Sequence, residues 1–201
     1  MRTATLAAGL LLSWLTGCRA FDPNLLAPTP GTLVARLPTA AQEAHASWAS
    51  PYPTSPWEAG RDRDLNHLFE REVRETLAEP FGEPRCFLLL TTNTLDERSG
   101  SGWFMASTMT LGLFNLLGLP YSRNRMLVET RLDVLDQDQN LVGSYRAQAD
   151  AKALGSIFSP TNYAQSDRVV YLQAVRGGLS QIKAQLAADA PRLQPLLAGG
   201  R

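Results

Sequence analysis

The sequence predicts an α+β domain with a small, mostly antiparallel sheet, helices packed on one face of that sheet, and an apolar insert segment. The first observation is the order of patterns along residues 61–190, which runs from helix to strand, apolar segment, hairpin and helix. The second is the alternation of side chains in the hairpin strands. The third is the three- and four-residue spacing of apolar side chains in the two helices.

The first helix is expected over residues 64–78, where apolar side chains recur at helical spacing and Pro80 with Gly82 supplies the end signal. Residues 86–92 follow as a short apolar run between turn residues, which is typical of a buried strand. Cys86 begins this run. We therefore expect a buried, unreactive thiol there rather than a reactive cysteine.

A hairpin is expected from residues 125–136 and 141–151, which the turn residues 136–140 join. One face of its first strand is apolar or β-branched, which predicts that this face packs inward while the charged face meets water. That inward face consists of Met126, Val128, Thr130, Leu132 and Val134. The turn begins like a calcium loop, but Leu141 and Ala147 stand where such a loop needs glycine and glutamate. We therefore expect side-chain bonds to the local backbone instead.

The last helix is expected over residues 166–188, with one narrow apolar seam along it. Gly177 and Gly178 interrupt this helix, where each glycine costs about 1 kcal/mol relative to alanine. Two interpretations remain open. Either the pair lets the backbone approach a neighbouring strand closely, or it is a tolerated kink.

Residues 103–121 form the apolar insert segment, and no charged residue occurs between Arg98 and Arg123. As one helix, this segment would be apolar on nearly every side, which suits burial or contact with lipid. We favour a buried core helix or loop, ahead of a membrane-surface or oligomer contact and of a true membrane span. If the segment is instead a contact surface for a membrane or partner, the candidate residues are Trp103, Phe104, Leu111, Leu113, Phe114, Leu116 and Leu117.

Prolines crowd residues 18–60, which predicts an extended tether with at most one short strand, at residues 32–37. The globular domain is expected over residues 61–190, and a flexible C-terminal tail over residues 191–201. We therefore expect the core to survive removal of residues 1 to about 60.

Leu15-Thr16-Gly17-Cys18 follows a short apolar run that Arg2 precedes. The motif resembles the lipobox of bacterial lipoproteins, in which a signal peptide, here residues 1–17, is removed before a cysteine that becomes lipid-modified. This resemblance implies that Cys18 is acylated and anchors the protein to a membrane. An ordinary signal peptide, or a buried helix with a chance cysteine, is the alternative. In bacterial lipoproteins, an Asp directly after the lipidated cysteine is the signal for retention in the inner membrane. This chain has Arg19 there, so the resemblance implies a location at the periplasmic face of the outer membrane.

Charge and motif patterns favour neither an enzyme nor a nucleic-acid-binding protein. The charges of the 19 basic and 19 acidic residues cancel, and no basic stripe in the sequence indicates a nucleic acid as a partner. His45 and His67 stand apart without paired cysteines, which does not match a metal-ligand pattern. Residues 99–102 lack the spacing of a nucleophile elbow and the lysine of a phosphate loop. We therefore expect no catalytic residue, no metal and no cofactor.

The order of elements also resembles small envelope lipoproteins of the curli-secretion and transporter-auxiliary kind, in which a lipidated tether leads into a mixed α/β domain with an apolar insertion. The likeness rests on Cys18, the proline-rich tether, the strand at 86–92, and the insert ending in Gly118-Leu119-Pro120 before the hairpin and helix. It implies a non-enzymatic, membrane-anchored protein that binds or assembles with another envelope component. Two alternatives stay open: a homo-oligomer whose apolar inserts enter the membrane, and a hydrolase with an unrecognised site.

Overall fold

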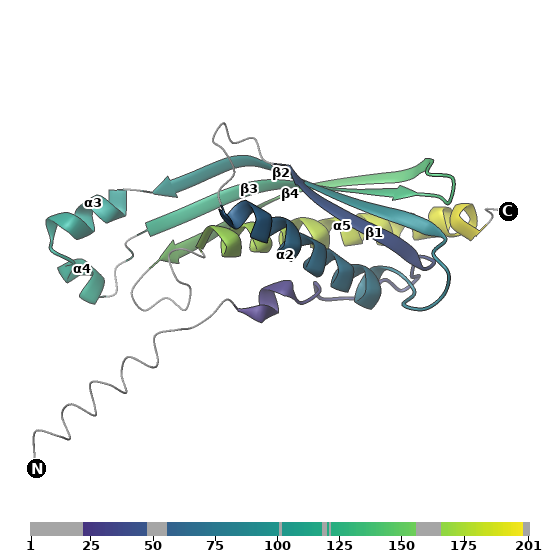
Figure 1. Ribbon diagram of the computed structural model, residues 1–201, viewed down its shortest axis with the longest axis horizontal. Helices are drawn as coiled ribbons and strands as arrows, with labels where there is room; N and C mark the ends of the chain where they lie inside the picture. Colours follow the sequence, from purple (N-terminus) through teal and green to yellow (C-terminus); the bar gives the residue numbers. More distant parts are fainter. Residues whose placement is uncertain are drawn as a thin grey trace, which may run out of the picture.

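The computed structural model describes residues 22–47, 56–100, 102–117, 120, 122–155 and 166–198. Its centre is a four-stranded sheet in the order β1-β2-β3-β4. The strands are β1 (Ala40–Ser47), β2 (Cys86–Gly100), β3 (Ser122–Leu135) and β4 (Leu141–Gly155). β1 runs parallel to β2, whereas the other two neighbouring pairs are antiparallel. The expected α+β fold with a mostly antiparallel sheet is confirmed (Figure 1).

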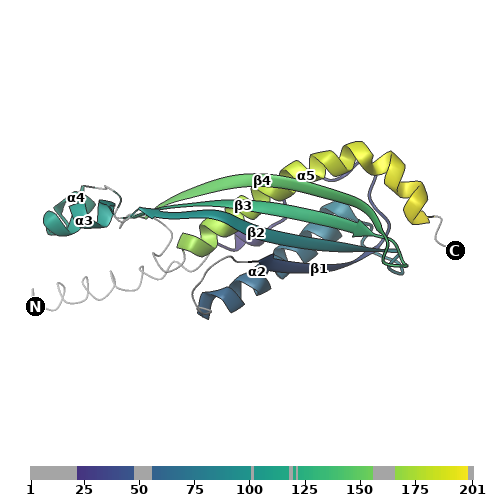
Figure 2. The same ribbon diagram turned by 90° about the horizontal axis from the view of Figure 1, so that it is seen from above.

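Two long helices run along the strands and pack on one face of the sheet (Figure 2). They are α2 (Pro56–Glu72), which continues as the π-helical turn η2 (Val73–Leu77), and α5 (Ser166–Ala198). A short 3-10 helix, η1 (Pro23–Leu26), contacts both of them. Two further helices, α3 (Gly102–Met109) and α4 (Leu113–Leu116), lie beyond one end of the sheet. Both expected long helices are therefore present, although α2 begins earlier and α5 ends later than the sequence indicated.

The core lies between the sheet and the two long helices. Every residue of the predicted inward face of β3 is buried, from Met126 to Val134 at alternate positions. The glycine pair of α5 meets this layer directly. A Cβ atom added to Gly178 would lie 2.5 Å from Oγ1 of Thr130, and one added to Gly177 would lie 3.0 Å from Cβ of Ala149. The glycines therefore let α5 approach β3 and β4 closely, which is the first of the two interpretations left open above.

Residues 22–47 belong to the folded domain, which corrects the expectation of an extended tether. Leu33 and Leu37 are buried in the core, and the strand lies at Ala40–Ser47 rather than at residues 32–37. Prolines remove backbone donors and break periodicity, but they do not keep the aliphatic side chains between them out of a core. Removal of residues 1–60 would take away an edge strand and both leucines, so the core is not expected to survive that truncation.

A buried ion pair fixes this N-terminal segment to both long helices. Nζ of Lys183 on α5 lies 2.5 Å from Oε1 of Glu72 on α2, and their side chains are only 9% and 0% exposed. Lys183 also donates to the carbonyl oxygens of Thr29 and Gly31, at 3.1 and 2.8 Å. Glu72 accepts from the backbone N–H and from the hydroxyl of Thr29, both at 2.6 Å. Because a buried charge without its partner costs about 3–5 kcal/mol, this network holds the segment in place.

The C-terminal segment is helical as far as Ala198, where a flexible tail from residue 191 was expected. α5 contains Pro191 and Pro195, and a proline inside a helix costs about 3 kcal/mol. Leu193 and Leu197 are buried, and each buried leucine contributes about 1.5–3 kcal/mol. The burial of these leucines therefore offsets much of the cost of the prolines, which sequence rules alone read as helix ends.

Side chains from the helices cover backbone groups along both edges of the sheet. At the β1 edge, the amide of Asn66 on α2 accepts from the N–H of Ala44 at 3.2 Å and donates to its carbonyl at 3.0 Å. At the β4 edge, Gln181 and Gln185 on α5 donate to the carbonyls of Gln148 and Arg146, at 3.3 and 3.0 Å. Open strand edges are templates for pairing with other chains, and these amides occupy part of that template.

Cys86 is fully buried at the start of β2, as expected. Burial raises the pKa of its thiol to about 11. Because the thiolate is the reactive species, this cysteine is chemically quiet at neutral pH.

Candidate membrane-contact site

The β2–β3 hairpin extends past the body of the domain and carries the apolar insert at its tip (Figure 1). The strands stay paired up to Gly100 and Arg123, with one irregularity in register between Thr94 and Asp96. α3 begins at Gly102, directly after β2, and α4 follows it. The insert therefore lies at one end of the long axis, and the C-terminal end of α5 lies at the other.

The α3–α4 connection has an unusual backbone. The N–H of Gly112 donates to the carbonyl of Ser107 at 2.9 Å, and the N–H of Leu111 donates to the carbonyl of Thr108 at 3.2 Å. These are the two bonds of a Schellman motif, in which the residue at the position of Leu111 is usually glycine because its φ is positive. Leu111 has a φ of 49°. A side chain in this region costs about 1–2 kcal/mol, and here that side chain is a leucine pointing into solvent.

Five large apolar side chains of the insert are exposed, by 62% to 94%. They are Met105, Met109, Leu111, Leu113 and Leu117. The expectation of a buried core segment is therefore wrong for these residues. The physical reason is that the long β2–β3 hairpin holds the segment beyond α2 and α5, so neither long helix covers it (Figures 1 and 2).

The predicted contact residues divide into two groups. Leu111, Leu113 and Leu117 have exposed side chains, on the connection, in α4 and at the C-cap of α4, respectively. The remaining four lie within helices of the insert, but their side chains are outside the described part of the structure: Trp103, Phe104, Phe114 and Leu116. Cys18 also lies outside the described residues. Among the residues that are described, no helix is both long and apolar enough to cross a membrane.

Sequence reasoning missed a row of basic side chains next to the insert. The register of the sheet places Arg98 of β2 opposite Arg125 of β3, and Arg125 opposite Lys152 of β4. All three side chains are substantially exposed, at 74%, 46% and 48%. The turn between β3 and β4 could have indicated the Arg125–Lys152 pair. Arg98 of β2 could not be placed beside Arg125, because the sequence indicated a strand that ends at residue 92.

Other candidate positions form no second site in the described part of the chain. His45 is exposed and lies 3.1 Å from Glu43, and His67 is exposed on α2. No group of three or more histidine, cysteine or acidic side chains there is arranged to hold a metal ion. A groove between residues 31–35 and α5 has Lys183 as its charged lining residue, and the Glu72 network already holds that lysine.

In comparisons with known proteins, no protein family and no curated protein matches the chain. Several solved structures match the chain over most of its length. A candidate lipoprotein from Caulobacter crescentus CB15 has 13% identity and a TM-score of 0.38, with 75% of this chain and 90% of that chain covered. A minor lipoprotein from Acinetobacter baumannii has 12% identity and a TM-score of 0.32, covering 78% and 94%. A PelC dodecamer from Paraburkholderia phytofirmans has 14% identity and a TM-score of 0.29, covering 75% and 92%. At these values, none of the three identifies the family or the function of this chain.

Proposed function

We propose that this chain is a non-enzymatic lipoprotein of the cell envelope, anchored through Cys18, that uses the α3–α4 insert to bind or assemble with another envelope component. The observation that carries the proposal is the exposure of the insert. Five large apolar side chains project from the tip of one hairpin, within a stretch that has no charged residue between Arg98 and Arg123. Contiguous exposed apolar surface marks interaction sites in soluble domains.

The local energetics support a contact role over a packing role. Leu111 keeps a left-handed backbone conformation that glycine would adopt without cost, and its side chain is 94% exposed. In the isolated domain this leucine adds strain and gains no burial. Strain of this kind persists at functional sites, where a ligand or partner supplies the missing contacts.

The alternative, a homo-oligomer whose apolar inserts enter the membrane, uses the same surface. It differs in requiring several copies of this chain to associate with one another. Particle size in detergent separates the two, because a homo-oligomer keeps a mass several times that of one chain after other envelope components have been removed.

The test uses the full-length protein, expressed in its native membrane and extracted in mild detergent. In a variant carrying Leu111→Asp and Leu113→Asp, the amount of co-purifying envelope components, or the fraction of the protein in larger particles, should fall at least tenfold. The matched control carries Val34→Asp and Leu141→Asp, because both of these apolar side chains are also exposed but lie outside the insert. An unchanged pull-down and particle size in the insert variant would rule out this proposal.

The anchor has its own test. Intact mass of the extracted protein should show a mature chain that begins at Cys18 and carries acyl chains, and Cys18→Ser should release the protein from the membrane fraction. Because one acyl chain gives only marginal membrane binding, several chains are expected. Fractionation of inner and outer membranes then tests the outer-membrane location that Arg19 implies.

A further inference from the structure

The basic row of Arg98, Arg125 and Lys152 lies on the outer face of the sheet, immediately behind the insert. Arg123, one position nearer to the insert on the same face, is also exposed. Acidic residues lie on the side away from the tip: Asp96 is 2.8 Å from Arg98, and Asp150 is 3.2 Å from Arg125 and 3.6 Å from Lys152. The two acids therefore compensate only part of the four positive charges.

The ion pairs to Asp96 and Asp150 favour the sheet, but the like charges that lie opposite each other work against its stability. Like charges directly opposite each other on neighbouring strands are destabilising, and here two such pairs share Arg125. A neutral polar side chain would be well solvated at these positions and would avoid that repulsion. An anionic ligand placed over the row would convert the repulsion into attraction.

The spacing between the row and the insert matches the polar layer of a membrane. Arg98 lies two positions before Gly100, the last residue of β2, which corresponds to about 7 Å of strand, and α3 begins at Gly102. Amphipathic surface helices bury their apolar faces by about 5–10 Å, and the headgroup layer lies just outside that depth. Long arginine and lysine side chains reach a further few ångströms toward such a layer. When the insert occupies the acyl boundary of one leaflet, the basic row lies at the level of the phosphates.

We propose that the partner of the insert is a lipid bilayer, and that Arg98, Arg125 and Lys152, with Arg123, bind the phosphate headgroups of anionic lipids while the apolar side chains enter one leaflet. This inference rests on the proposed contact role of the insert. Two observations favour a bilayer as the partner: the positive charge of the row complements anionic headgroups, and its distance from the insert matches the depth of the headgroup layer. The short helices of the insert suit entry into the interface and not passage across the bilayer.

The experiment uses a chain that begins at Arg19, which keeps every residue that the structure describes and removes the lipid anchor that would mask weaker binding. Sedimentation is measured with vesicles of phosphatidylcholine alone and of phosphatidylcholine mixed with phosphatidylglycerol. Each basic side chain near an anionic surface contributes roughly a factor of five in affinity. The unmodified chain should therefore bind the anionic vesicles at least tenfold more tightly, and high salt should remove this preference by screening.

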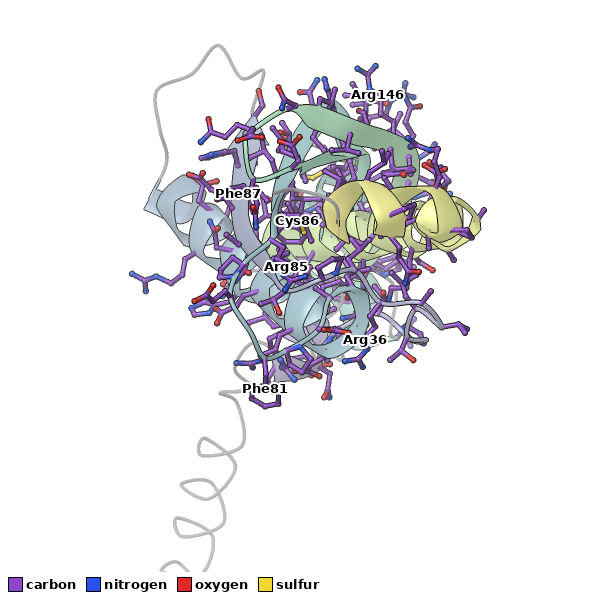
Figure 3. All side chains as sticks on the ribbon, turned by 90° about the vertical axis from the view of Figure 1, so that its right-hand side faces the viewer. Arg36, Phe81, Arg85, Cys86, Phe87 and Arg146 are labelled. Carbon is purple, nitrogen blue, oxygen red and sulfur yellow. The ribbon has the colours of Figure 1, made fainter. Side chains whose placement is uncertain are left out.

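Two charge-matched variants sharpen the result. Arg98→Gln, Arg125→Gln and Lys152→Gln together should abolish the preference for anionic vesicles while the melting temperature stays unchanged or rises. The control carries Arg74→Gln, Arg85→Gln and Arg146→Gln, which are exposed residues away from the insert. Figure 3 shows Arg85 and Arg146 at the end of the molecule opposite the insert. This control should keep the preference.

The inference would be overturned by equal binding to both vesicle types, by a preference that survives high salt, or by equal losses in the two triple variants. A chain that binds neither vesicle type would also overturn it. The proposed function would then stand if the Leu111 and Leu113 variant still loses its envelope components, and the partner would be a protein with an acidic surface.

Discussion

The β3–β4 and β2–β3 connections join antiparallel strands of similar length, yet one is a tight turn and the other is a two-helix insert. In the turn over residues 136–140, Asp136 accepts from the backbone N–H of Asn140 at 2.8 Å and from its side-chain amide at 3.0 Å. The polar groups of this turn satisfy one another, as expected for a structural connection and not for a calcium loop. In the insert, large apolar side chains face solvent. A residue with positive φ occurs in both connections, Gln139 in the turn and Leu111 in the insert, so exposure is the feature that separates them.

The difference separates the part of the hairpin meander that serves the fold from the part that we propose serves contact. Antiparallel strands need only a short turn to pair, so the sheet has no requirement for residues 101–121. A leucine gains about 1.5–3 kcal/mol on burial, and the insert forgoes that gain at several positions in the isolated domain. The polar groups of the turn satisfy one another within the chain, whereas under the proposed function the apolar side chains of the insert are buried only against a second surface.

The largest expected effect comes from comparing two leucines. Leu132→Asp places a carboxylate in the core, where Leu132 is fully buried, and should lower the free energy of unfolding by at least about 4 kcal/mol. Leu113→Asp, at a side chain 62% exposed, should change it by less than about 0.5 kcal/mol. Urea denaturation followed by circular dichroism measures both. A Leu113→Asp protein that unfolds as readily as Leu132→Asp would mean that the insert packs as core.

Exchanging the connections tests the comparison directly. Residues 101–121 are replaced by Asp-Gln-Asp-Gln-Asn, the sequence of residues 136–140. The shortened chain should fold with an equal or slightly higher melting temperature, because a shorter loop has a smaller entropy of closure. It should lose at least tenfold in association with envelope components or vesicles. A chain that fails to fold after this exchange would show that the insert supports the sheet.

Two glycines offer a smaller contrast. Gly178→Ala forces a methyl group against Thr130, which should cost about 1–3 kcal/mol of overpacking, reduced by about 1 kcal/mol of helix propensity. Gly112→Ala has open space around it, and its positive φ of 79° strains only the insert. Its effect on global unfolding should stay below about 1 kcal/mol, because no other element depends on the insert. Equal losses in thermal unfolding would contradict this distinction.

The smallest expected effect is a difference in pH dependence. Hydrogen bonds from Asn140 hold the pKa of Asp136 below its usual value. A carboxyl group with a lowered folded pKa stabilises the protein above its unfolded pKa, and this contribution disappears as the pH falls through the folded pKa. Asp136→Asn should therefore flatten the fall of the melting temperature between about pH 5 and pH 2. The insert has no acidic or basic side chain that titrates in this pH range, so Leu113→Ser should leave the shape of this curve unchanged.

The local parts of the fold could be predicted from sequence. Alternation identified the inward face of β3, because side chains in a strand follow a period of two wherever the strand lies. The three- and four-residue spacing of apolar side chains likewise identified α2 and α5, because side chains on one face of a helix follow a period of 3.6. Residues 22–47 were misjudged, since Leu33 and Leu37 occur among prolines without any period, and their burial depends on Lys183 and Glu72 far away in the chain.

The sequence indicated which segment is unusual in composition, but not that this segment lies exposed at the tip of a hairpin. The lack of charge across residues 103–121 indicated the segment whose exposed side chains form the candidate site. Hydrophobicity alone does not say whether a segment is covered, because that depends on how far β2 and β3 extend past α2 and α5. The row of Arg98, Arg125 and Lys152 is further out of reach, because it exists only through the register of three strands.

The covered sheet edges have a consequence for crowding. A lipid anchor confines copies of a protein to a plane, which raises their local concentration and the frequency of sideways collisions. On β4, Gln181, Gln185 and Arg192 already occupy carbonyl groups that a neighbouring strand would use, and Asn66 does the same on β1. Copies packed at high density on a membrane would thus collide through side chains instead of adding strands to one another's sheets. The molecule could accumulate on a surface without becoming the seed of a fibre.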